Sequence, residues 1–312
     1  MSYTSPYVGI ATFLKSPHVA EPTGADGHVA VLGIPYDEAT TSRPGARYGP
    51  RALRDVSTFY AYREDGEWLY DGEAGVRLLD GVRVVDAGDV YVPVTAPPEV
   101  RHERIAGRVQ ALVDAGLFPV VLGGDHSVTF PVLQGLVAGR SGRPVHLVQF
   151  DTHMDYWDEE EGMRYTHASP IIRAHEGSLL TGVTQYGIRG LHQAADNIEL
   201  ARERGVHTFW CRQAKQTPVE ELVAHIEPGA DTYVTFDIDA LDPAIAPGTG
   251  TPEPGGFTYY EAKDILRAVA SRAHLVGMDM VEVSPLFDPA QTTALHGVRL
   301  IIDCLGAAFA TR

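Results

Sequence analysis

The sequence predicts a single-domain, three-layer α/β/α protein, in which helices cover both faces of a central, mostly parallel sheet of about eight strands. Two observations predict this fold. Short apolar runs recur along the chain, most of them ending in Gly, Pro or Asp, and helical patterns lie between most of the runs. The runs are rich in Val and Ile and lack strict alternation, which is typical of strands buried on both faces of a parallel sheet. Repeated alternation of strand and helix favours an open, doubly wound sheet.

Eight runs are expected to form the strands. In chain order they are VAVLGIP (29–35), VRVVDAGD (82–89), PVVLGGD (119–125), VHLVQFD (145–151), VTQYGIR (183–189), HTFWC (207–211), TYVTFDID (232–239) and LVGMDMVEV (275–283).

Three helical patterns between these runs have recognisable ends or faces. Residues 50–62, PRALRDVSTFYAY, follow Gly49 and place Pro50 at the helix start, where its missing N–H costs nothing. Residues 97–116 end in a glycine, which is common just past a helix C-terminus. Residues 258–274 are amphipathic.

Chain length and composition favour one large domain. The 312 residues are 44% hydrophobic, enough to bury a sizeable core, and α/β folds of this length often form one domain. No internal repeat, low-complexity tract or linker interrupts the chain. We therefore expect an α/β domain over residues 29–312, preceded by an N-terminal extension over residues 1–28.

The negative charge balance argues against nucleic acids and anionic membranes as partners. Lys and Arg number 25 against 41 Asp and Glu, a net charge of −16, whereas nucleic acids and anionic membranes require clustered positive charge. Cys211 and Cys304 lie far apart and indicate neither a disulfide framework nor a zinc ribbon. The N-terminus lacks a basic start followed by an apolar stretch, and no apolar span approaches about 18 residues. A cytoplasmic protein is expected.

Ionisable residues stand where the apolar runs end. Asp151, His153 and Asp155 directly follow Phe150, and their alternate spacing places them on one side of an extended chain. Three further residues end other runs: His126, Asp237 and Asp239. In open α/β sheets, ligands bind beyond the carboxyl ends of the strands. Carboxylates that converge there would repel one another unless one or two divalent cations neutralised them.

These six side chains predict a two-metal site. Four carboxylates and two imidazoles are too many ligands for one tetrahedral zinc, and no thiolate is among them. An oxygen-rich set with some imidazole suits an ion such as Mn²⁺, and the number of ligands suits a bridged pair. Two ions ~3.5–4 Å apart could hold a hydroxide between them as a nucleophile.

Four motifs in order resemble the signature of the ureohydrolases, which include arginases and agmatinases. They are GGDHS (123–127), FDTHMD (150–155), FDIDALDPAIAPGTGTPEPGG (236–256) and GMDMVEV (277–283), and the resemblance spans roughly Ala30 to the C-terminus. It implies an arginase-like fold, two Mn²⁺ ions per chain and hydrolysis of a guanidinium group to urea and an amine. One ion would take His126 and Asp155, the other His153 and Asp239, with Asp151 and Asp237 bridging both.

The resemblance also implies the catalytic residues. His167, in RYTHASP, matches the histidine that relays protons at the mouth of the site, and Glu282, in MVEVSP, matches the glutamate that pairs with the guanidinium. A carboxylate fork fits a planar, permanently charged guanidinium. Asp155 could then pass the remaining proton of the nucleophile to the departing amine.

Agmatine is the expected substrate within this family. GIPYDEATTSRPGARYGPRALR and TPEPGG resemble agmatinases more than arginases, and the acidic loop of residues 158–161 would attract the amine end of a dication. The products would be putrescine and urea, in polyamine biosynthesis. Arg164 near this loop could instead serve a carboxylate-tailed substrate such as 4-guanidinobutyrate. The family resemblance further implies a homo-oligomer, a trimer or hexamer.

Two other functions stay open for this fold. One is a mononuclear zinc deacetylase, which would not need both His126 and Asp239. The other is a catalytically dead, metal-stabilised polyamine-binding protein, which would be expected to have lost a ligand, His167 or Glu282. Asp125 and Asp279 could orient metal ligands or could be buried hydrogen-bond acceptors.

Overall fold

The computed structural model describes residues 5–61 and 69–310, and in this part of the chain eight parallel strands form one sheet in the order β4-β1-β5-β10-β9-β6-β7-β8. The strands are β1 (Val29–Gly33), β4 (Val84–Asp89), β5 (Phe118–Leu122), β6 (Val145–Phe150), β7 (Leu180–Ile188), β8 (Val206–Trp210), β9 (Asp231–Asp237) and β10 (His274–Val281). Each overlaps one of the eight apolar runs, so the predicted sheet is confirmed. A separate antiparallel pair, β2 (Leu69–Asp71) and β3 (Val76–Leu78), was not expected from the sequence.

Nine α-helices lie in the described residues. They are α1 (Gly49–Ser57), α2 (Pro98–Asp114), α3 (Thr129–Gly139), α4 (Pro170–Glu176), α5 (Ala195–Glu203), α6 (Cys211–Ala214), α7 (Val219–Leu222), α8 (Tyr259–Arg272) and α9 (Thr292–Ala308). Among these residues, no helix combines the length and the apolar character that crossing a bilayer requires.

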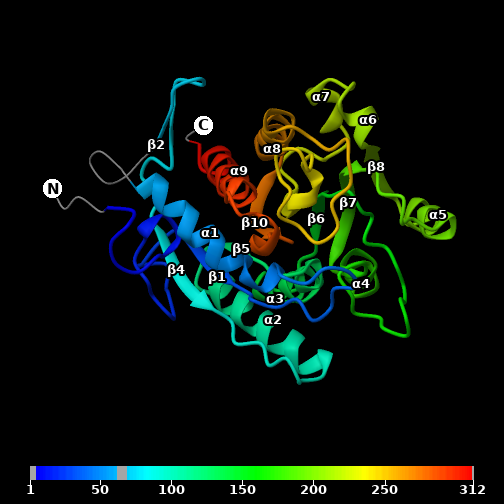
Figure 1. Cartoon of the computed structure of the whole chain (residues 1–312), viewed down its shortest axis with the longest axis horizontal. Helices are drawn as coiled ribbons and strands as arrows, with labels where there is room; N and C mark the ends of the chain where they lie inside the picture. The colour runs from blue at the N-terminus through cyan, green and yellow to red at the C-terminus, as the bar shows by residue number, and fades with distance from the viewer. Residues whose placement is uncertain (1–4, 62–68, 311–312) are drawn as a thin grey trace.

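The helices form a layer on each face of the sheet (Figure 1). Alternate residues of a strand point to opposite faces, so Val29 and Val31 join one hydrophobic core while Ala30 and Leu32 join the other. Buried side chains of α1, α8 and α9 fill the first core, and those of α2, α3 and α4 fill the second. The structure therefore has the predicted three layers.

The three predicted helical patterns are present with recognisable ends. Helix α8 begins with a capping box, in which Thr258 and Glu261 exchange side-chain and backbone hydrogen bonds. Helix α2 ends just before Gly116, whose φ of +76° suits a residue without a side chain. The pattern over residues 50–62 becomes α1 and a 3₁₀ turn (Thr58–Ala61), and its last residue, Tyr62, lies outside the described residues.

Part of the expected N-terminal extension packs onto the domain. Phe13 and Leu14 are buried in the first core, and the backbone N–H of Phe13 donates to Asp86 at 2.9 Å. Arg54 of α1 pairs with the same carboxylate at 2.8 Å. Residues 1–4 of the expected extension lie outside the described residues, and the boundary at residue 28 stays a prediction.

The strand order brings together segments that are far apart in the sequence. From β5 the chain passes to β6 and continues outward through β7 and β8, and only then do β9 and β10 fill the gap between β5 and β6. As a result, β5, β10, β9 and β6 are consecutive neighbours at the centre of the sheet, with their carboxyl ends along one edge. A ligand site is expected at this edge.

Candidate metal centre and active site

All six predicted metal ligands lie at the carboxyl ends of the central strands. His126 begins a 3₁₀ turn after β5; Asp151, His153 and Asp155 follow β6; Asp237 ends β9, and Asp239 lies in the 3₁₀ turn that follows β9. The four aspartates and His126 are at most 5% exposed, while the His153 side chain is 19% exposed. The structure thus brings the six together, as the sequence predicts.

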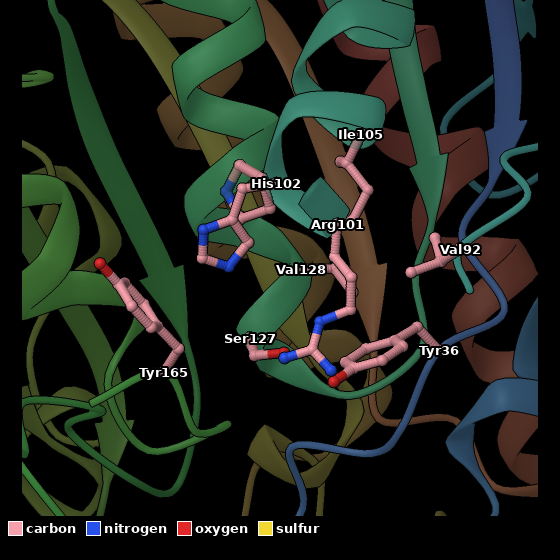
Figure 2. Close-up of a pocket in the computed structure, with 9 residues that line it drawn as sticks. Tyr36, Val92, Arg101, His102, Ile105, Ser127, Val128 and Tyr165 are labelled. Carbon is pink, nitrogen blue, oxygen red and sulfur yellow. The ribbon is translucent and has the colours of Figure 1, made fainter. Parts of the chain in front are cut away.

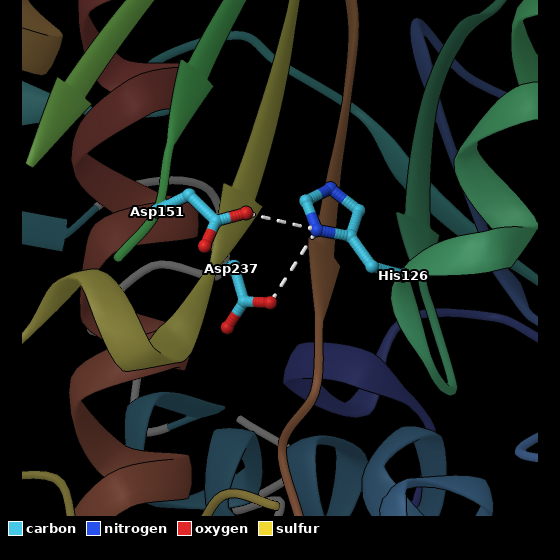
Figure 3. Close-up of side chains that lie close together, drawn as sticks. All are labelled: His126, Asp151 and Asp237. Carbon is cyan, nitrogen blue, oxygen red and sulfur yellow. Dashed lines mark ion pairs between the residues drawn. The ribbon is translucent and has the colours of Figure 1, made fainter. Parts of the chain in front are cut away.

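His126 is the centre of one group of ligand atoms. Its Nδ1 lies 2.7 Å from Asp155 Oδ2, 3.1 Å from Asp151 Oδ2 and 3.4 Å from Asp237 Oδ2. Figure 3 shows the imidazole pointing toward Asp151 and Asp237 across the gap between the strand ends. Ligand atoms of His126, Asp151 and Asp237 lie within 4.8 Å of one another, which is compatible with a shared metal ion.

A second group forms around His153. Its Nδ1 lies 3.3 Å from Asp239 Oδ2 and 3.5 Å from Asp151 Oδ1. Asp151 therefore presents one carboxylate oxygen to each histidine. Ligand atoms of Asp151, His153 and Asp155 also lie within 4.8 Å of one another. Two adjacent ions that share Asp151 would fit this arrangement.

Orphaned polar atoms and excess negative charge both indicate that this cluster can hold cations. His126 Nδ1 and Asp155 Oδ2 are buried and only 2.7 Å apart, yet neither makes a hydrogen bond with any of the described residues. Leaving such buried atoms without hydrogen bonds is costly, and a metal ion bound between them would satisfy both. Even if both histidines were protonated, four buried carboxylates would leave the cluster with two uncompensated negative charges.

The pKa values in the metal-free cluster follow from the same crowding. Burial, and then the charges of Asp239 and Asp151, raise the pKa of Asp237 well above its usual range. Burial and the Asp151 charge raise the pKa of Asp155 to about 6. Burial opposes a charge on His126, but the surrounding carboxylates outweigh it and raise the pKa of this imidazole well above 6.5. The metal-free cluster therefore retains protons that divalent cations would displace.

Buried partners hold the ligands in position. His126 Nε2 lies 2.8 Å from Thr235 Oγ1, and this hydroxyl donates to Asp279 Oδ1 at 2.6 Å. Such contacts to the second nitrogen fix the orientation of a ligating histidine. Asp279, one of the two residues left open by the sequence, thus contacts the site through Thr235. Gln149 Nε2 donates to Asp151 Oδ2 at 2.7 Å.

Asp125 supports the loop over the site. Its Oδ2 accepts from the backbone N–H of Ala39 at 2.9 Å, and its Oδ1 accepts from the backbone N–H of Ser127 at 3.0 Å. At the preceding residue, Gly124, a side chain would collide with the Tyr36 backbone, because a Cβ there would lie 1.7 Å from the Tyr36 carbonyl oxygen. This close approach brings the segment after β1 against the end of β5.

The predicted catalytic residues His167 and Glu282 lie beside the ligand cluster. Glu282 Oε1 accepts from the backbone N–H of His126 at 2.9 Å and lies 3.2 Å from His167 Nδ1. Glu282 Oε2 accepts no hydrogen bond from any residue that the structure describes, so one carboxylate oxygen is left for a ligand. The structure brings these two residues to the cluster, and their catalytic roles stay predictions.

Two of the predicted site residues have a left-handed backbone. Asp155 has a φ of +51° and Glu282 a φ of +61°; Asp adopts this conformation more readily than most residues, whereas it is uncommon for Glu. Such a conformation costs roughly 1–3 kcal/mol and persists where the surrounding structure imposes it, often at functional sites. Here it aims the two carboxylates at the edge of the sheet.

The acidic loop of residues 158–161 is partly neutralised. Asp158 pairs with Arg164 at 3.1 Å and also with Arg173. Arg164 in turn pairs with Glu176 at 3.1 Å. The arginine considered from the sequence as a reader of substrate carboxylates is therefore engaged by two acidic side chains of its own chain.

Sequence reasoning missed Arg189, which joins three segments of the site. At the end of β7, its guanidinium donates to the backbone carbonyls of Asp239 and Glu253, both at 2.8 Å, and of Pro254 at 3.2 Å. Its own backbone N–H donates to the Thr152 carbonyl at 3.0 Å. A lone arginine after a strand carries no distinctive sequence signal, because its partners are backbone atoms.

A small cavity lies beside the cluster. It lies next to Ser127 and is lined by Tyr36, Arg101, His102 and Tyr165, with the Arg101 guanidinium 4.9 Å from the centre of the Tyr36 ring (Figure 2). Its volume of about 10 Å³ is room for roughly one water molecule.

Comparison with known proteins relates nearly the whole chain to one family. A model described as the arginase family matches residues 27–306. Guanidinopropionase of Pseudomonas aeruginosa is 38% identical, covering 98% of this chain and 94% of its own length. Mitochondrial agmatinase of Gallus gallus is 36% identical, covering 96% of this chain and 85% of its own. The solved structure of proclavaminate amidino hydrolase from Streptomyces clavuligerus superposes with a TM-score of 0.85 at 31% identity, over 97% of this chain and 98% of that one.

Proposed function

The chain belongs to the arginase family and is a hydrolase of guanidino C–N bonds, and on this premise we propose that it is a binuclear manganese enzyme that hydrolyses agmatine to putrescine and urea. One observation carries the proposal. Six ligand side chains, a glutamate with a free oxygen and a histidine bonded to that glutamate converge at the ends of four adjacent strands. No proposed ligand or catalytic residue is missing, which argues against a dead binding protein.

The donor set supports Mn²⁺ as the ion. Carboxylate oxygens outnumber imidazole nitrogens, and no cysteine is among the ligand groups of the described residues, which favours a hard or borderline divalent ion. We assign His126 and Asp155 to one ion, His153 and Asp239 to the other, and Asp151 and Asp237 to both. Two bound ions would neutralise these carboxylates and supply a hydroxide nucleophile at neutral pH.

The remaining steps use side chains of this chain. Glu282 would bind the substrate guanidinium through its free Oε2 and hold the carbon toward the metal cluster, since a carboxylate matches a guanidinium in charge and geometry. Asp155 would carry the last proton of the nucleophile to the departing amine. His167, beside Glu282, would exchange protons with the amine and with the water that replaces the nucleophile.

The charges at the rim of the site support agmatine. Arg164 is paired with Asp158 and Glu176, so its charge does not repel the amine of a dicationic substrate. Glu159 and Glu161 of the acidic loop are exposed. An acidic rim attracts a cationic chain and accelerates its binding.

One observation favours a second substrate class, the guanidino acids. Arg43 donates to the carbonyls of Gly250 at 2.8 Å and Thr249 at 3.0 Å, and in the described part of the chain no carboxylate pairs with it. Gly250 borders the site, because a Cβ there would lie 3.8 Å from Glu282 Oε2. Arg43, held against the carbonyl of this glycine, could receive the carboxylate of 3-guanidinopropionate or 4-guanidinobutyrate.

Urea release from the Mn²⁺-loaded protein tests both substrate classes. Agmatine, 3-guanidinopropionate, 4-guanidinobutyrate and arginine are compared at equal concentration, with wild type and the Arg43→Met variant. We expect agmatine to be preferred and little affected by the substitution. Preference for a guanidino acid, with a raised KM in Arg43→Met, would assign the second class. No urea from any of the four would refute the proposed activity.

A further inference from the structure

The loop after β1 contacts the predicted catalytic histidine both through its backbone and at its ring. The backbone N–H of His167 donates to the Ala39 carbonyl at 3.0 Å. Thr41 approaches the ring, with its backbone N–H 3.2 Å and its Oγ1 2.9 Å from His167 Nε2. Both residues lie in the stretch GIPYDEATTSRPGARYGPRALR (33–54), which supported the expected substrate but assigned neither residue to the site. The loop nevertheless provides both described hydrogen-bond partners of Nε2.

The backbone N–H of Thr41 selects the tautomer of the neutral ring. An amide N–H can donate but cannot accept, so it requires a lone pair on Nε2. The hydrogen of neutral His167 then lies on Nδ1, which faces Glu282 Oε1 at 3.2 Å. The ring is therefore oriented to donate inward and to receive a proton on its outward side.

The Thr41 hydroxyl can serve either protonation state of the ring. A hydroxyl donates to the lone pair of a neutral ring and, after rotating, accepts from an imidazolium N–H. The His167 side chain is 12% exposed and the Glu282 side chain 3% exposed, whereas Thr41 is exposed. The hydroxyl therefore lies between a buried proton-transfer group and solvent.

We propose that Thr41 is a positioning residue for the His167 ring and that its hydroxyl relays protons between solvent and Nε2. The inference rests on the proposed function of His167. For proton entry, Oγ1 takes a proton from a solvent water or a buffer acid while its own proton passes to Nε2, and the imidazolium then gives its Nδ1 proton to the departing amine. For return, Nδ1 takes a proton from the incoming water and Nε2 releases one outward through Oγ1. One proton enters and one leaves in each turnover, and Thr41 is unchanged.

Charges around the ring support a role in both protonation states. Burial opposes a charge on His167, but its bond and ion pair with Glu282 and the charges of Asp125 and Asp155 outweigh burial and raise its pKa to about 9. The Thr41 N–H favours the opposite, uncharged state of Nε2. The hydroxyl is the partner that can adapt to either state.

Substitutions that separate the hydroxyl from the backbone test the relay. Thr41→Val keeps the size and the N–H but removes the hydroxyl, and Thr41→Ser keeps the hydroxyl. Thr40→Val is the matched control, because the Thr40 hydroxyl is buried on the same loop without a hydrogen-bond partner among the described residues. We expect Thr41→Val to lower kcat roughly 10- to 100-fold with little change in KM, and added imidazole buffer to restore most of it. Thr41→Ser and Thr40→Val should keep kcat within about threefold of wild type.

Three outcomes would overturn the relay: an unchanged kcat in Thr41→Val, no rescue by buffer, or an equal loss in Thr41→Ser. A readout independent of turnover uses the ¹⁵N NMR titration of His167. Thr41→Val should lower the pKa of His167 by about one unit, because the imidazolium loses its acceptor, and Thr40→Val should not. A wild type that releases no urea would refute the proposed function, whereas an unshifted titration in Thr41→Val would refute the relay contact itself.

Discussion

Replacing Glu282 by Gln changes one charge while keeping the shape of the site. The backbone N–H of His126 and, in neutral His167, Nδ1–H both need an acceptor at Oε1, so the amide oxygen of the new side chain would face them. The amide nitrogen would then occupy the position of the free Oε2. Because Gln tolerates a φ of +61° about as well as Glu, the backbone strain is unchanged.

We expect the Glu282→Gln substitution to weaken the binding of the substrate guanidinium. A hydrogen bond to a charged group contributes about 1.5–3 kcal/mol, and in the variant an N–H donor would meet the N–H donors of the guanidinium. We expect a loss of about 3 kcal/mol, or roughly 100- to 200-fold in kcat/KM. The pKa of His167 should also fall from about 9 toward its ordinary value, because Glu282 is the partner that raises it most.

Steady-state urea release measures this loss, with bound manganese determined on the same samples. The metal ligands are untouched, so Glu282→Gln should keep two Mn²⁺ ions per chain. Glu103→Gln is the control, since Glu103 is exposed on α2 and is not among the proposed ligand or catalytic residues. A Glu282→Gln variant with two ions bound and kcat/KM within about threefold of wild type would show that Glu282 does not bind the guanidinium.

Three further predictions follow from the same structure. Asp237→Asn should lose bound metal and at least about 100-fold in activity together, because this carboxylate is assigned to both ions; full activity with two ions would refute the assignment. Arg189→Lys should weaken binding of the ion assigned to Asp239 more than binding of the other ion, by roughly 10- to 100-fold in a calorimetric Mn²⁺ titration. The reason is that a lysine ammonium cannot reach all the backbone carbonyls, including that of Asp239, to which the Arg189 guanidinium donates. Unchanged affinities for both ions would contradict this prediction. Burial lowers the pKa of His102 and of His146 to about 4 in the folded protein, whereas the same histidines have a pKa near 6.5 in the unfolded chain. Between pH 4 and pH 6.5 the unfolded state therefore binds more protons than the folded state. The free energy of unfolding therefore keeps the full contribution of these two histidines above pH 6.5 and loses it as the pH drops toward 4, by up to about 3 kcal/mol for each histidine. Urea unfolding of the metal-free protein at about pH 7 and about pH 5 measures this loss, and replacing both histidines by Gln should reduce it.

The strands were predictable because burial on both faces leaves a strong sequence signal. Uninterrupted Val- and Ile-rich runs such as residues 29–35 and 275–283 became central strands. Helix α3 carries no comparable signal. Its sequence, TFPVLQGLVAG, is buried on most sides, so no polar face marks it as helical. The β2–β3 hairpin is short and largely exposed, and its two strands have no apolar alternation to reveal them.

The site was predictable as far as it depends on side chains that follow strands in the sequence. Asp151, His153 and Asp155 could be placed at a sheet edge by spacing alone. Arg189 and Thr41 could not, because one contacts backbone carbonyls and the other reaches His167 across 126 residues of sequence. Such contacts are created by the order of strands in the sheet, which local patterns do not encode.

We propose that two metal ions at these strand ends drive guanidine hydrolysis, and a manganese titration of the metal-free protein tests this role of the ions. Bound Mn²⁺ per chain and urea release from agmatine and 4-guanidinobutyrate are measured at each step. We expect urea release to rise until two ions are bound per chain and to be absent without metal. Full activity in the metal-free protein, or two bound ions with no urea from either substrate, would contradict this role of the metal ions.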